Sequence, residues 1–400
     1  MNKTITSFSH LCSECEACLQ ACPKGAIKIC MDTEGFGYPV VSQDVCINCG
    51  ICLKVCPMLH ANEIKHAKST FVYAVQSKDS ATLFKSSSGG VFSILAHFVL
   101  EKNGVVYGAA WDKDMVVKHI GVETEKELEN LRGSKDIHSN TTDVFIEIKK
   151  HLINGRWVLF TGTPCQVAGL RLFLRNDYSE LITADIVCHG TPSQNIFDLF
   201  INNFKKEHNA IIKHYSFRDK KIMGWSTTST SYVIDKKSGK EKYIYYDKNL
   251  RAYFNAFIRG YISRNDCYCC PFACPERVSD ITLADYWDVN KHHPEITNLN
   301  KGVSLVLLNT EKGKNVFESL KDRMLVWNST LQNALDTTNN NLKYPTSRPI
   351  ERETSYIHAF DDYISFRNYC LSGDKPESFF RKLYYIKKIK NFPIVRWLMK

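Results

Sequence analysis

Eight of the cysteines between Cys12 and Cys56 form two copies of one ligand pattern. The first copy, which begins at Cys12, reads C-x2-C-x2-C-x3-C-P, and the second repeats it from Cys46. Three thiolates on one short loop can bind three irons of a cubane, whereas the fourth cysteine of the run serves the other cluster. The spacing therefore predicts two [4Fe-4S] clusters. Their predicted ligands are Cys12, Cys15, Cys18 and Cys56 for one cluster and Cys46, Cys49, Cys52 and Cys22 for the other.

A zinc or disulfide module is the alternative for this segment. Zinc sites use four ligands in two separated pairs, whereas each run here has four cysteines on one short stretch of chain. The cluster interpretation is therefore preferred, and it is typical of a two-cluster ferredoxin. Because so short a segment has little core of its own, the clusters are expected to hold its fold together.

The composition suits a cofactor-rich protein of two or three domains. The 400 residues are 44% hydrophobic, which is enough to bury a sizeable core. Residues 1–11 lack a basic stretch followed by an apolar one, so no secretory signal is expected. Apolar runs such as 91–100 and 303–308 are too short to span a bilayer. Sixteen cysteines in such a chain indicate metal ligation in a reducing compartment, and we expect a cytoplasmic protein.

Two further cysteines follow predicted strands at equivalent places. Residues 157–160 and 181–187 read as strands, each followed by a loop and a helix, and these loops contain Cys165 and Cys188. In a parallel α/β sheet, ligands gather outside the carboxyl ends of the strands. We therefore expect these two thiols to lie close together.

A downstream segment rich in cysteine supplies partners for a third [4Fe-4S] cluster. The preferred ligand set combines the two strand-end cysteines with a C-x2-C pair. The rival set is Cys267, Cys270 and Cys274 with one of the strand-end cysteines, and zinc is the competing metal at this site. The members of the preferred set are Cys165, Cys188, Cys267 and Cys270.

Two loops could bind a cofactor phosphate. The first, residues 85–90 (KSSSGG), precedes a helix predicted over 91–102, and free backbone N–H groups at a helix start attract anions. The second, residues 132–135 (RGSK), places two cations beside a glycine after a short helix that begins with a Thr124/Glu127 capping box. Taken alone, the first loop is better explained by an ordinary N-cap. For the second loop, chemistry alone leaves both a phosphate site and an exposed helix end open.

Blocks of sequence resemble the family of coenzyme F420 hydrogenase/dehydrogenase beta subunits. The resemblance covers about residues 10–310 and implies an iron-sulfur flavoprotein that binds FAD, with FMN as the alternative, and a further [4Fe-4S] cluster nearby. This chain continues RGSK with Asp136, where relatives commonly have an aromatic residue. The blocks are SSSGG (86–90), GVVYGAAWD (104–112), LRGSK (131–135), FTGTPCQVAGLR (160–171), CHGTPS (188–193) and SDITLADYWD (279–288). Carried over by position, the flavin-site candidates are Ser87, Ser88, Gly89, Gly90, Arg132, Gly133, Ser134 and Lys135.

The expected architecture is α/β (α+β) with four regions. Residues 1–66 form a bacterial-type 2[4Fe-4S] ferredoxin domain, residues 67–150 carry the flavin loops, and residues 151–310 form an α/β region that binds the flavin and the third cluster. Residues 311–400 are expected to be helical and basic. Within them, residues 379–390 read as an amphipathic helix that either packs on the domain or contacts an anionic membrane or an acidic partner.

The family resemblance implies an oxidoreductase that exchanges a hydride between FAD and a soluble carrier or organic substrate, F420-like or other. Single electrons then pass through the clusters to or from a ferredoxin or a partner redox enzyme. No catalytic acid or base can be named from the sequence. The alternatives are an electron-transfer subunit without its own substrate site and a zinc-stabilised binding protein. The net charge of +10 is diffuse and no nucleic-acid recognition module is found, so no nucleic-acid partner is expected.

Overall fold

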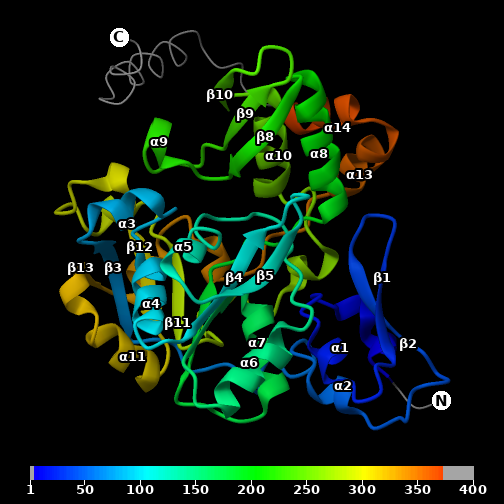
Figure 1. Ribbon diagram of the computed structural model, residues 1–400, viewed down its shortest axis with the longest axis vertical. Coiled ribbons are helices and arrows are strands. Elements are labelled where there is room, and N and C mark those ends of the chain that lie inside the picture. Colours follow the sequence, from blue (N-terminus) through cyan, green and yellow to red (C-terminus); the bar gives the residue numbers. More distant parts are fainter. Residues whose placement is uncertain (1–3, 373–400) are drawn as a thin grey trace.

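A mixed eight-stranded sheet forms the centre of the molecule (Figure 1). The computed structural model describes residues 4–372. The strand order is β13-β3-β12-β11-β7-β6-β4-β5. The four consecutive strands from β11 to β4 run parallel to one another. The predicted α/β class is confirmed, but antiparallel strands flank the parallel centre on both sides. The strands are β3 (Phe71–Ser77), β4 (Val105–Trp111), β5 (Val117–Val122), β6 (Val158–Gly162), β7 (Leu181–Ile186), β11 (Ile281–Asp285), β12 (Ser304–Leu308) and β13 (Met324–Ser329).

Helices cover both faces of the sheet because its strands alternate between two apolar faces. On β4, Val106 faces the core on the side covered by α4 (Val91–Leu100), and α11 (Glu311–Glu318) covers β12 on the same side. Its neighbour Tyr107 packs on the opposite face with α6 (Val144–Ile153) and α7 (Pro164–Leu174). The short helices α3 (Ser80–Lys85), α5 (Glu125–Leu128) and α12 (Leu331–Leu335) lie in the connections, and α5 begins with the expected capping box.

The N-terminal cysteine module packs on the α6/α7 face of the sheet. It contains a 3₁₀ helix (Ile5–Leu11), α1 (Ala17–Ala21), a hairpin of β1 (Ile27–Met31) and β2 (Gly37–Val41), and α2 (Ile51–Lys54). The repeat seen in the sequence is also present in the backbone, since Glu14 and Asn48, and likewise Glu16 and Gly50, have positive φ. Gly169 of α7 allows the close approach, because a Cβ there would lie 3.0 Å from the Cys15 sulfur.

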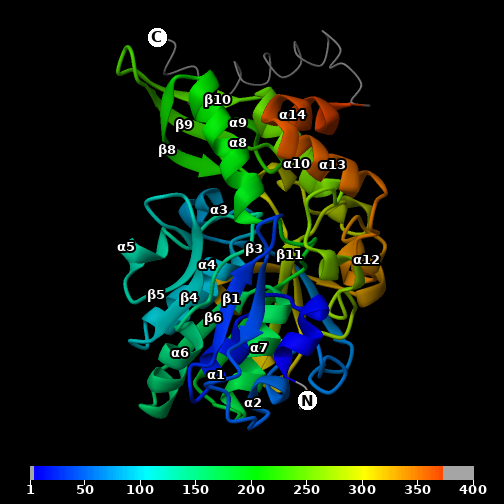
Figure 2. The same ribbon diagram turned by 90° about the vertical axis from the view of Figure 1, so that its right-hand side faces the viewer.

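A second lobe stands above the central sheet (Figure 2). It has a three-stranded antiparallel sheet of β8 (Ala210–Ser216), β9 (Thr230–Asp235) and β10 (Glu241–Tyr245). Its helices are α8 (Gln194–Glu207), α10 (Lys248–Ile258), α13 (Glu351–Asp361) and α14 (Tyr363–Leu371). Phe197, Phe200 and Tyr253 are central in its aromatic core. The segment between β8 and β9, which includes α9 (Lys220–Met223), returns toward the central sheet.

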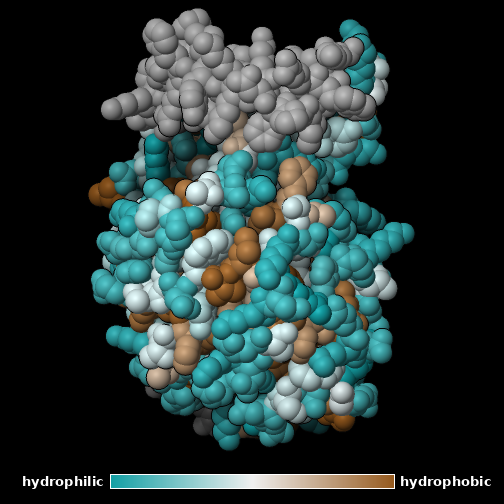
Figure 3. Space-filling model, turned by 90° about the vertical axis from the view of Figure 1, so that its left-hand side faces the viewer, coloured by the Kyte–Doolittle hydropathy of each residue, from teal (hydrophilic) through white to brown (hydrophobic). Residues whose placement is uncertain are grey.

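The region beyond residue 310 differs from the helical region that the sequence predicts. It supplies α11 to α14, but it also supplies β13, which pairs with β3 at the edge of the sheet. The amphipathic helix predicted over 379–390 lies outside the described residues. Between residues 4 and 372, no helix has the length and apolarity needed to cross a bilayer. The face drawn in Figure 3 is mostly hydrophilic, with small separate apolar areas.

Candidate cluster and flavin sites

One set of N-terminal cysteines is enclosed inside the protein. Cys12, Cys15, Cys18 and Cys56 all line one small cavity, and Cys15 and Cys18 are buried. Burial raises the pKa of the Cys12 thiol to about 12. Burial also raises the pKa of Cys18, and the nearby thiols of Cys12 and Cys56 raise it further. Four converging thiols that are hard to ionise alone form a donor set suited to a cationic iron cluster, which stabilises thiolates.

The second N-terminal set lies at the surface. Cys49 is exposed, and Cys22, Cys46 and Cys52 are half-buried. Burial raises the pKa of Cys52, and the thiols of Cys46 and Cys49 add to this shift. Cys22 follows α1, which packs against α2. The two predicted ligand sets therefore differ in depth, one being internal and one reaching solvent.

The third cysteine set assembles from segments that are far apart in the sequence. The cavity wall here contains all four members of the preferred set, namely Cys165, Cys188, Cys267 and Cys270. Burial raises the pKa of the Cys188 thiol well above its ordinary value, and the other three thiols raise it further. Among residues 4–372, no three His, Cys, Asp or Glu side chains converge closely enough for a single metal ion.

Cys269 and Cys274 lie outside this cavity. Cys269 is exposed, and the Cys274 thiol lies 3.4 Å from the carbonyl oxygen of Pro271 and 3.3 Å from that of Glu276. A thiol that donates to its own loop is not directed at the other cysteines. The geometry therefore favours the preferred ligand set over the rival set that includes Cys274.

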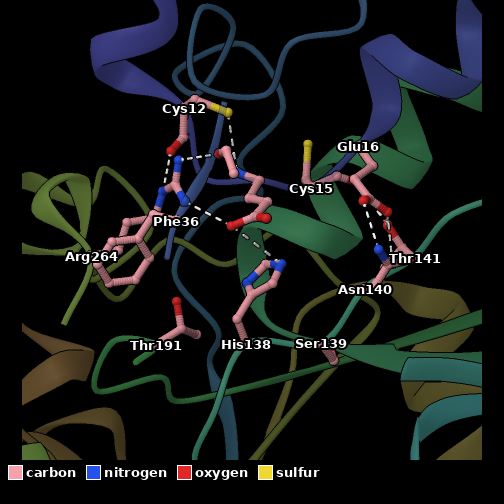
Figure 4. A network of polar contacts seen from close by, with 12 residues as sticks. Cys12, Cys15, Glu16, Phe36, His138, Ser139, Asn140, Thr141, Thr191 and Arg264 are labelled. Atoms are coloured by element: carbon pink, nitrogen blue, oxygen red, sulfur yellow. Dashed lines mark hydrogen bonds and ion pairs between the residues drawn. The ribbon is translucent and has the colours of Figure 1, made fainter. Parts of the chain in front are cut away.

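A buried polar network joins the N-terminal module to the central domain (Figure 4). The Glu16 carboxylate accepts hydrogen bonds from the Thr141 backbone N–H at 2.8 Å and from the Asn140 side chain at 3.1 Å. Ser13 and Met58 line both the internal N-terminal cavity and the third cysteine cavity. The two cavities therefore share part of their walls, which sequence spacing does not reveal.

A larger cavity of about 410 Å³ adjoins the third cysteine set, and Cys188 and Thr163 line both. Seven flavin-site candidates lie in its wall, namely Ser87, Ser88, Gly90, Arg132, Gly133, Ser134 and Lys135. Gly89 is the exception. Its N–H donates to the Ser304 hydroxyl, and a Cβ would lie 2.1 Å from the Val75 carbonyl oxygen. Gly89 therefore lets the loop approach β3 and β12 closely.

The two cations of the RGSK loop are engaged within the protein. Arg132 donates to Ser93 and pairs with Glu125 and Glu129. The Lys135 ammonium donates to the carbonyl oxygens of Asn130, Leu131 and Arg132 at 2.9–3.1 Å. These contacts hold the loop in shape, so we assign both cations to building the cavity wall.

Buried polar atoms without partners test whether the cavity suits a polar cofactor. The Ser134 backbone N–H donates to the Ser87 hydroxyl at 3.0 Å, which joins the two loops. The Ser134 hydroxyl, one Asp136 carboxylate oxygen and the Arg218 Nε are buried in the cavity wall with no hydrogen-bond partner among the described residues. Such atoms normally find a partner, so they fit a ligand with polar groups.

The opposite wall contains residues that no local motif indicated. Arg218 donates to Asp136 at 2.8 Å and lies 3.9 Å from Asp285. This pairing explains how an acidic residue is tolerated after RGSK. Trp287 stacks on Trp225 with ring centroids 4.5 Å apart, and the Trp225 indole N–H donates to Asp285 at 2.8 Å. Arg218 reaches this wall from the segment between β8 and β9, far from the sequence blocks, and Trp225 of the same segment packs behind Trp287.

A second, outer cavity of about 470 Å³ shares the Ser86–Ser87 and Arg132–Lys135 segments with the first. Lys113, Lys213 and Lys221 line it, and no carboxylate among the described residues lies within ion-pair distance of them. The acidic residues in its wall are engaged, for example Asp112 with Lys118 and Glu129 with Lys85. The cavity therefore has an excess of positive charge.

The two histidines that line the larger cavity are held by hydrogen bonds. His189, beside Cys188, has one ring nitrogen 2.9 Å from Asn341 and the other 3.0 Å from the Ile258 carbonyl oxygen. His119 contacts the Thr161 carbonyl oxygen and the Ser139 hydroxyl, each at 2.9 Å. Burial lowers the pKa of His119 to about 4. Neither ring has a free nitrogen for proton transfer in this arrangement.

The buried His119 is expected to make the folded protein less stable at acid pH. The pKa of His119 is about 4 in the folded protein, against an ordinary value of 6.5. Between these two pH values the unfolded chain therefore binds a proton that the folded protein does not bind. Its contribution to stability is complete above pH 6.5 and is lost as the pH falls toward 4. Between pH 7 and pH 5, the free energy of unfolding of the unchanged protein should fall by about 2 kcal/mol more than that of the His119→Asn variant. Urea unfolding at both pH values measures this, and an equal loss in both proteins would contradict it.

Comparisons with known proteins agree with the two-part organisation. Residues 11–59 match the 4Fe-4S dicluster domain, and residues 155–333 match the C terminus of the coenzyme F420 hydrogenase/dehydrogenase beta subunit. Residues 155–333 are therefore similar to the C-terminal part of F420 hydrogenase/dehydrogenase beta subunits. The resemblance found in the sequence blocks is confirmed, and the chain is an iron-sulfur protein related to these oxidoreductase subunits.

Two comparisons point to proteins of Methanosarcina species. One F(420)H(2) dehydrogenase subunit of Methanosarcina mazei is 24% identical over 189 residues, which are 43% of this chain and 51% of that subunit. The chain therefore spans about half the length of this curated relative. A chain of the F420-reducing [NiFe] hydrogenase complex of Methanosarcina barkeri superposes with a TM-score of 0.45 and 14% identity, covering 75% of this chain and 95% of that chain.

The match to the beta-subunit domain includes all four cysteines of the third set, at positions 165, 188, 267 and 270. The loops at 86–90 and 131–135 precede the matched residues. The family assignment therefore bears on the third cysteine set directly, whereas the flavin candidates depend on the geometry of the cavity.

Proposed function

We propose that this protein is an iron-sulfur flavoprotein that exchanges a hydride between an anionic soluble carrier and FAD. Single electrons then pass through three [4Fe-4S] clusters to or from a ferredoxin or a partner redox enzyme. The observation that carries the proposal is the continuity of the cavities, each of which shares wall residues with the next.

The cysteine sets follow one another from the surface to the interior. Cys49 of the surface set is exposed, and Cys52 of the same set lies near Cys18 of the internal set. The internal set meets the third set where Cys15 lies near Cys165. The third set borders the larger cavity through Cys188. This series would connect a bound cofactor with the protein surface without a gap in the ligand sets.

FAD, when bound, would exchange a hydride with the carrier and single electrons with iron-sulfur clusters. The residues of this chain would orient it. Ser87 and Ser134 hold the two loops together, the Ser134 hydroxyl is a polar atom with no hydrogen-bond partner among the described residues, and Trp287 provides a flat aromatic surface. The outer cavity would bind the carrier through the lysines, which suits phosphate or carboxylate groups. The M. mazei dehydrogenase suggests F420H2 as one carrier to try, and NAD(P)H is another.

The proposal is tested by the flavin released from protein purified without oxygen. We expect about one FAD per chain, and we expect the Ser134→Trp variant to lose most of it, since the new ring would fill the cavity. The Ser134 hydroxyl has no partner among the described residues, so this change removes no internal hydrogen bond of the side chain. The matched control is Ser347→Trp, an exposed residue away from the cavity, which should keep its flavin.

Absence of flavin from the unchanged protein, even after cluster reconstitution and incubation with FAD, would overturn the flavin assignment. The chain would then be an electron-transfer subunit that receives electrons from a partner enzyme. Flavin present in equal amounts in both tryptophan variants would place the flavin elsewhere in the protein.

A further inference from the structure

Arg264 is a deeply buried cation beside the internal cysteine set. It follows α10 in the chain, its side chain is 1% exposed, and it enters the N-terminal module. Its Nε donates to the Cys12 carbonyl oxygen, and its two terminal nitrogens donate to the Glu14 carboxylate at 2.8 Å and to the Gly37 carbonyl oxygen at 2.7 Å. Figure 4 shows the guanidinium beside Cys12.

Aromatic rings hold the guanidinium in this position. The Tyr38 ring centroid lies 4.3 Å from the Arg264 Cζ, and the Phe36 centroid lies 5.4 Å from it. Both rings come from the N-terminal hairpin and its turn, whereas Arg264 comes from a much later segment of the chain. Stacking on two rings together with donation along three directions favours arginine over lysine at this site.

The same residue also contacts the third cysteine set through its backbone. The Cys267 N–H donates to the Arg264 carbonyl oxygen at 3.1 Å, and the Arg264 N–H donates to the Thr191 carbonyl oxygen at 3.1 Å. Arg264 therefore joins a loop of the internal set, at Cys12, with a loop of the third set, at Cys267.

A buried positive charge in this position has an electrostatic consequence. Reduction of an iron-sulfur cluster adds one negative charge, and nearby charge and hydrogen bonds shift its potential. Arginine stays protonated at all relevant pH values, and a buried charge is weakly screened. Glu14 and Asp266, the latter at 3.2 Å from Nε, both pair with the guanidinium, so Arg264 offsets negative charge that would otherwise lie beside the ligand loop at Cys12. The lysines near the surface set, Lys24 and Lys54, are exposed, so solvent screens them.

We infer that Arg264 raises the reduction potential of the cluster held by Cys12, Cys15, Cys18 and Cys56, and that it positions this cluster against the third one. The inference rests on the proposed function, since it presumes that both clusters are present. Arg264 is a positioning residue, because it contacts ligand loops and no reacting atom.

The test is a redox titration followed by electron paramagnetic resonance on the full chain, purified and reconstituted without oxygen. We expect Arg264→Gln to shift one midpoint potential downward by about 59 mV, which is a tenfold change in a one-electron equilibrium. The other midpoints should stay unchanged. Arg264→Lys keeps the charge and should restore most of the shift. The matched control is Arg367→Gln, which removes another buried, ion-paired arginine, one that pairs with Glu207 in the second lobe.

Iron is quantified first, so that two kinds of failure are distinguished. Unchanged protein without iron-sulfur signals would overturn the proposed function and this inference together. Full iron content with equal midpoints in Arg264→Gln and the unchanged protein would overturn the inference alone.

A second variant covers the case in which Arg264→Gln does not retain its iron. Asp266 is the carboxylate that pairs with the Arg264 Nε, and Asp266→Asn removes its negative charge while keeping the shape of the side chain. We expect the same midpoint to move upward in this variant, because less of the arginine charge is offset. No movement, or a downward movement, would overturn the inference.

Discussion

Replacement of Cys188 by serine is expected to remove the third cluster and to interrupt electron transfer between the flavin and the N-terminal clusters. Cys188 is the one proposed ligand that lines both the cysteine cavity and the larger cavity. Iron should fall from about twelve to about eight atoms per chain, since each cubane holds four. Electron transfer from a hydride donor to a ferredoxin should fall by roughly 100-fold or more, beyond what loss of an outer-sphere contact causes. Iron analysis and stopped-flow absorbance measure the two effects.

The matched control is Cys269→Ser. Cys269 is close to Cys267 in the sequence, but its thiol is exposed and outside the cavity. This variant should keep the full iron content and the rate of the unchanged protein. If Cys269→Ser lost as much iron as Cys188→Ser, or if Cys188→Ser kept all its iron, the ligand set of the third cluster would be wrong.

Reversal of charge in the outer cavity is expected to weaken binding of the hydride carrier. Lys213 and Lys221 both line this cavity, and neither has a carboxylate partner among the described residues. The Lys213→Glu/Lys221→Glu variant should raise KM for an anionic carrier roughly tenfold or more, since a tenfold loss corresponds to about 1.4 kcal/mol. The value of kcat should change little, because these side chains bind the carrier away from the reacting atoms. Steady-state kinetics with F420H2 and with NADPH measures both constants.

Two controls test this effect, one by varying the ionic strength and one by changing a lysine outside the cavity. The difference in KM should shrink as ionic strength rises, since salt screens exposed charges. Lys237→Glu, on the turn between β9 and β10, changes a lysine of the same small sheet outside the cavity and should leave KM unchanged. An equal rise in KM for Lys237→Glu would indicate a general effect of net charge and would contradict a specific site.

Local chemistry explains why many elements could be predicted from the sequence. Pro164 at the first turn of α7 and the Thr124/Glu127 capping box at α5 are short-range signals, and both helices begin where these residues indicate. The apolar runs predicted β6 and β7 with only small errors at their ends. β13 was missed because an edge strand is stabilised by its partner β3, which lies far earlier in the chain.

The two candidate flavin loops show that a residue's position in a motif does not by itself predict whether its side chain can bind a ligand. Arg132 and Lys135 are cations beside a glycine turn, which the sequence alone cannot distinguish from a phosphate site. In the folded protein both are engaged by acidic side chains or carbonyl oxygens, while Lys213 and Lys221, which belong to no motif, are free of carboxylate partners among the described residues. Which cations are available depends on packing and cannot be read from residue type.

The sequence by itself determined the repeated cysteine spacing, and with it the kind of metal centre in the N-terminal module, because three ligands of each cluster lie on one short loop. Only the tertiary structure showed that the four cysteines of the preferred third set line one cavity, that Arg264 lies beside Cys12, and that the cavities share walls. The physical reason is the range of the interactions. A short loop has few ways to present its thiols, whereas contacts between distant segments exist only when the sheet, its helices and the second lobe have packed together.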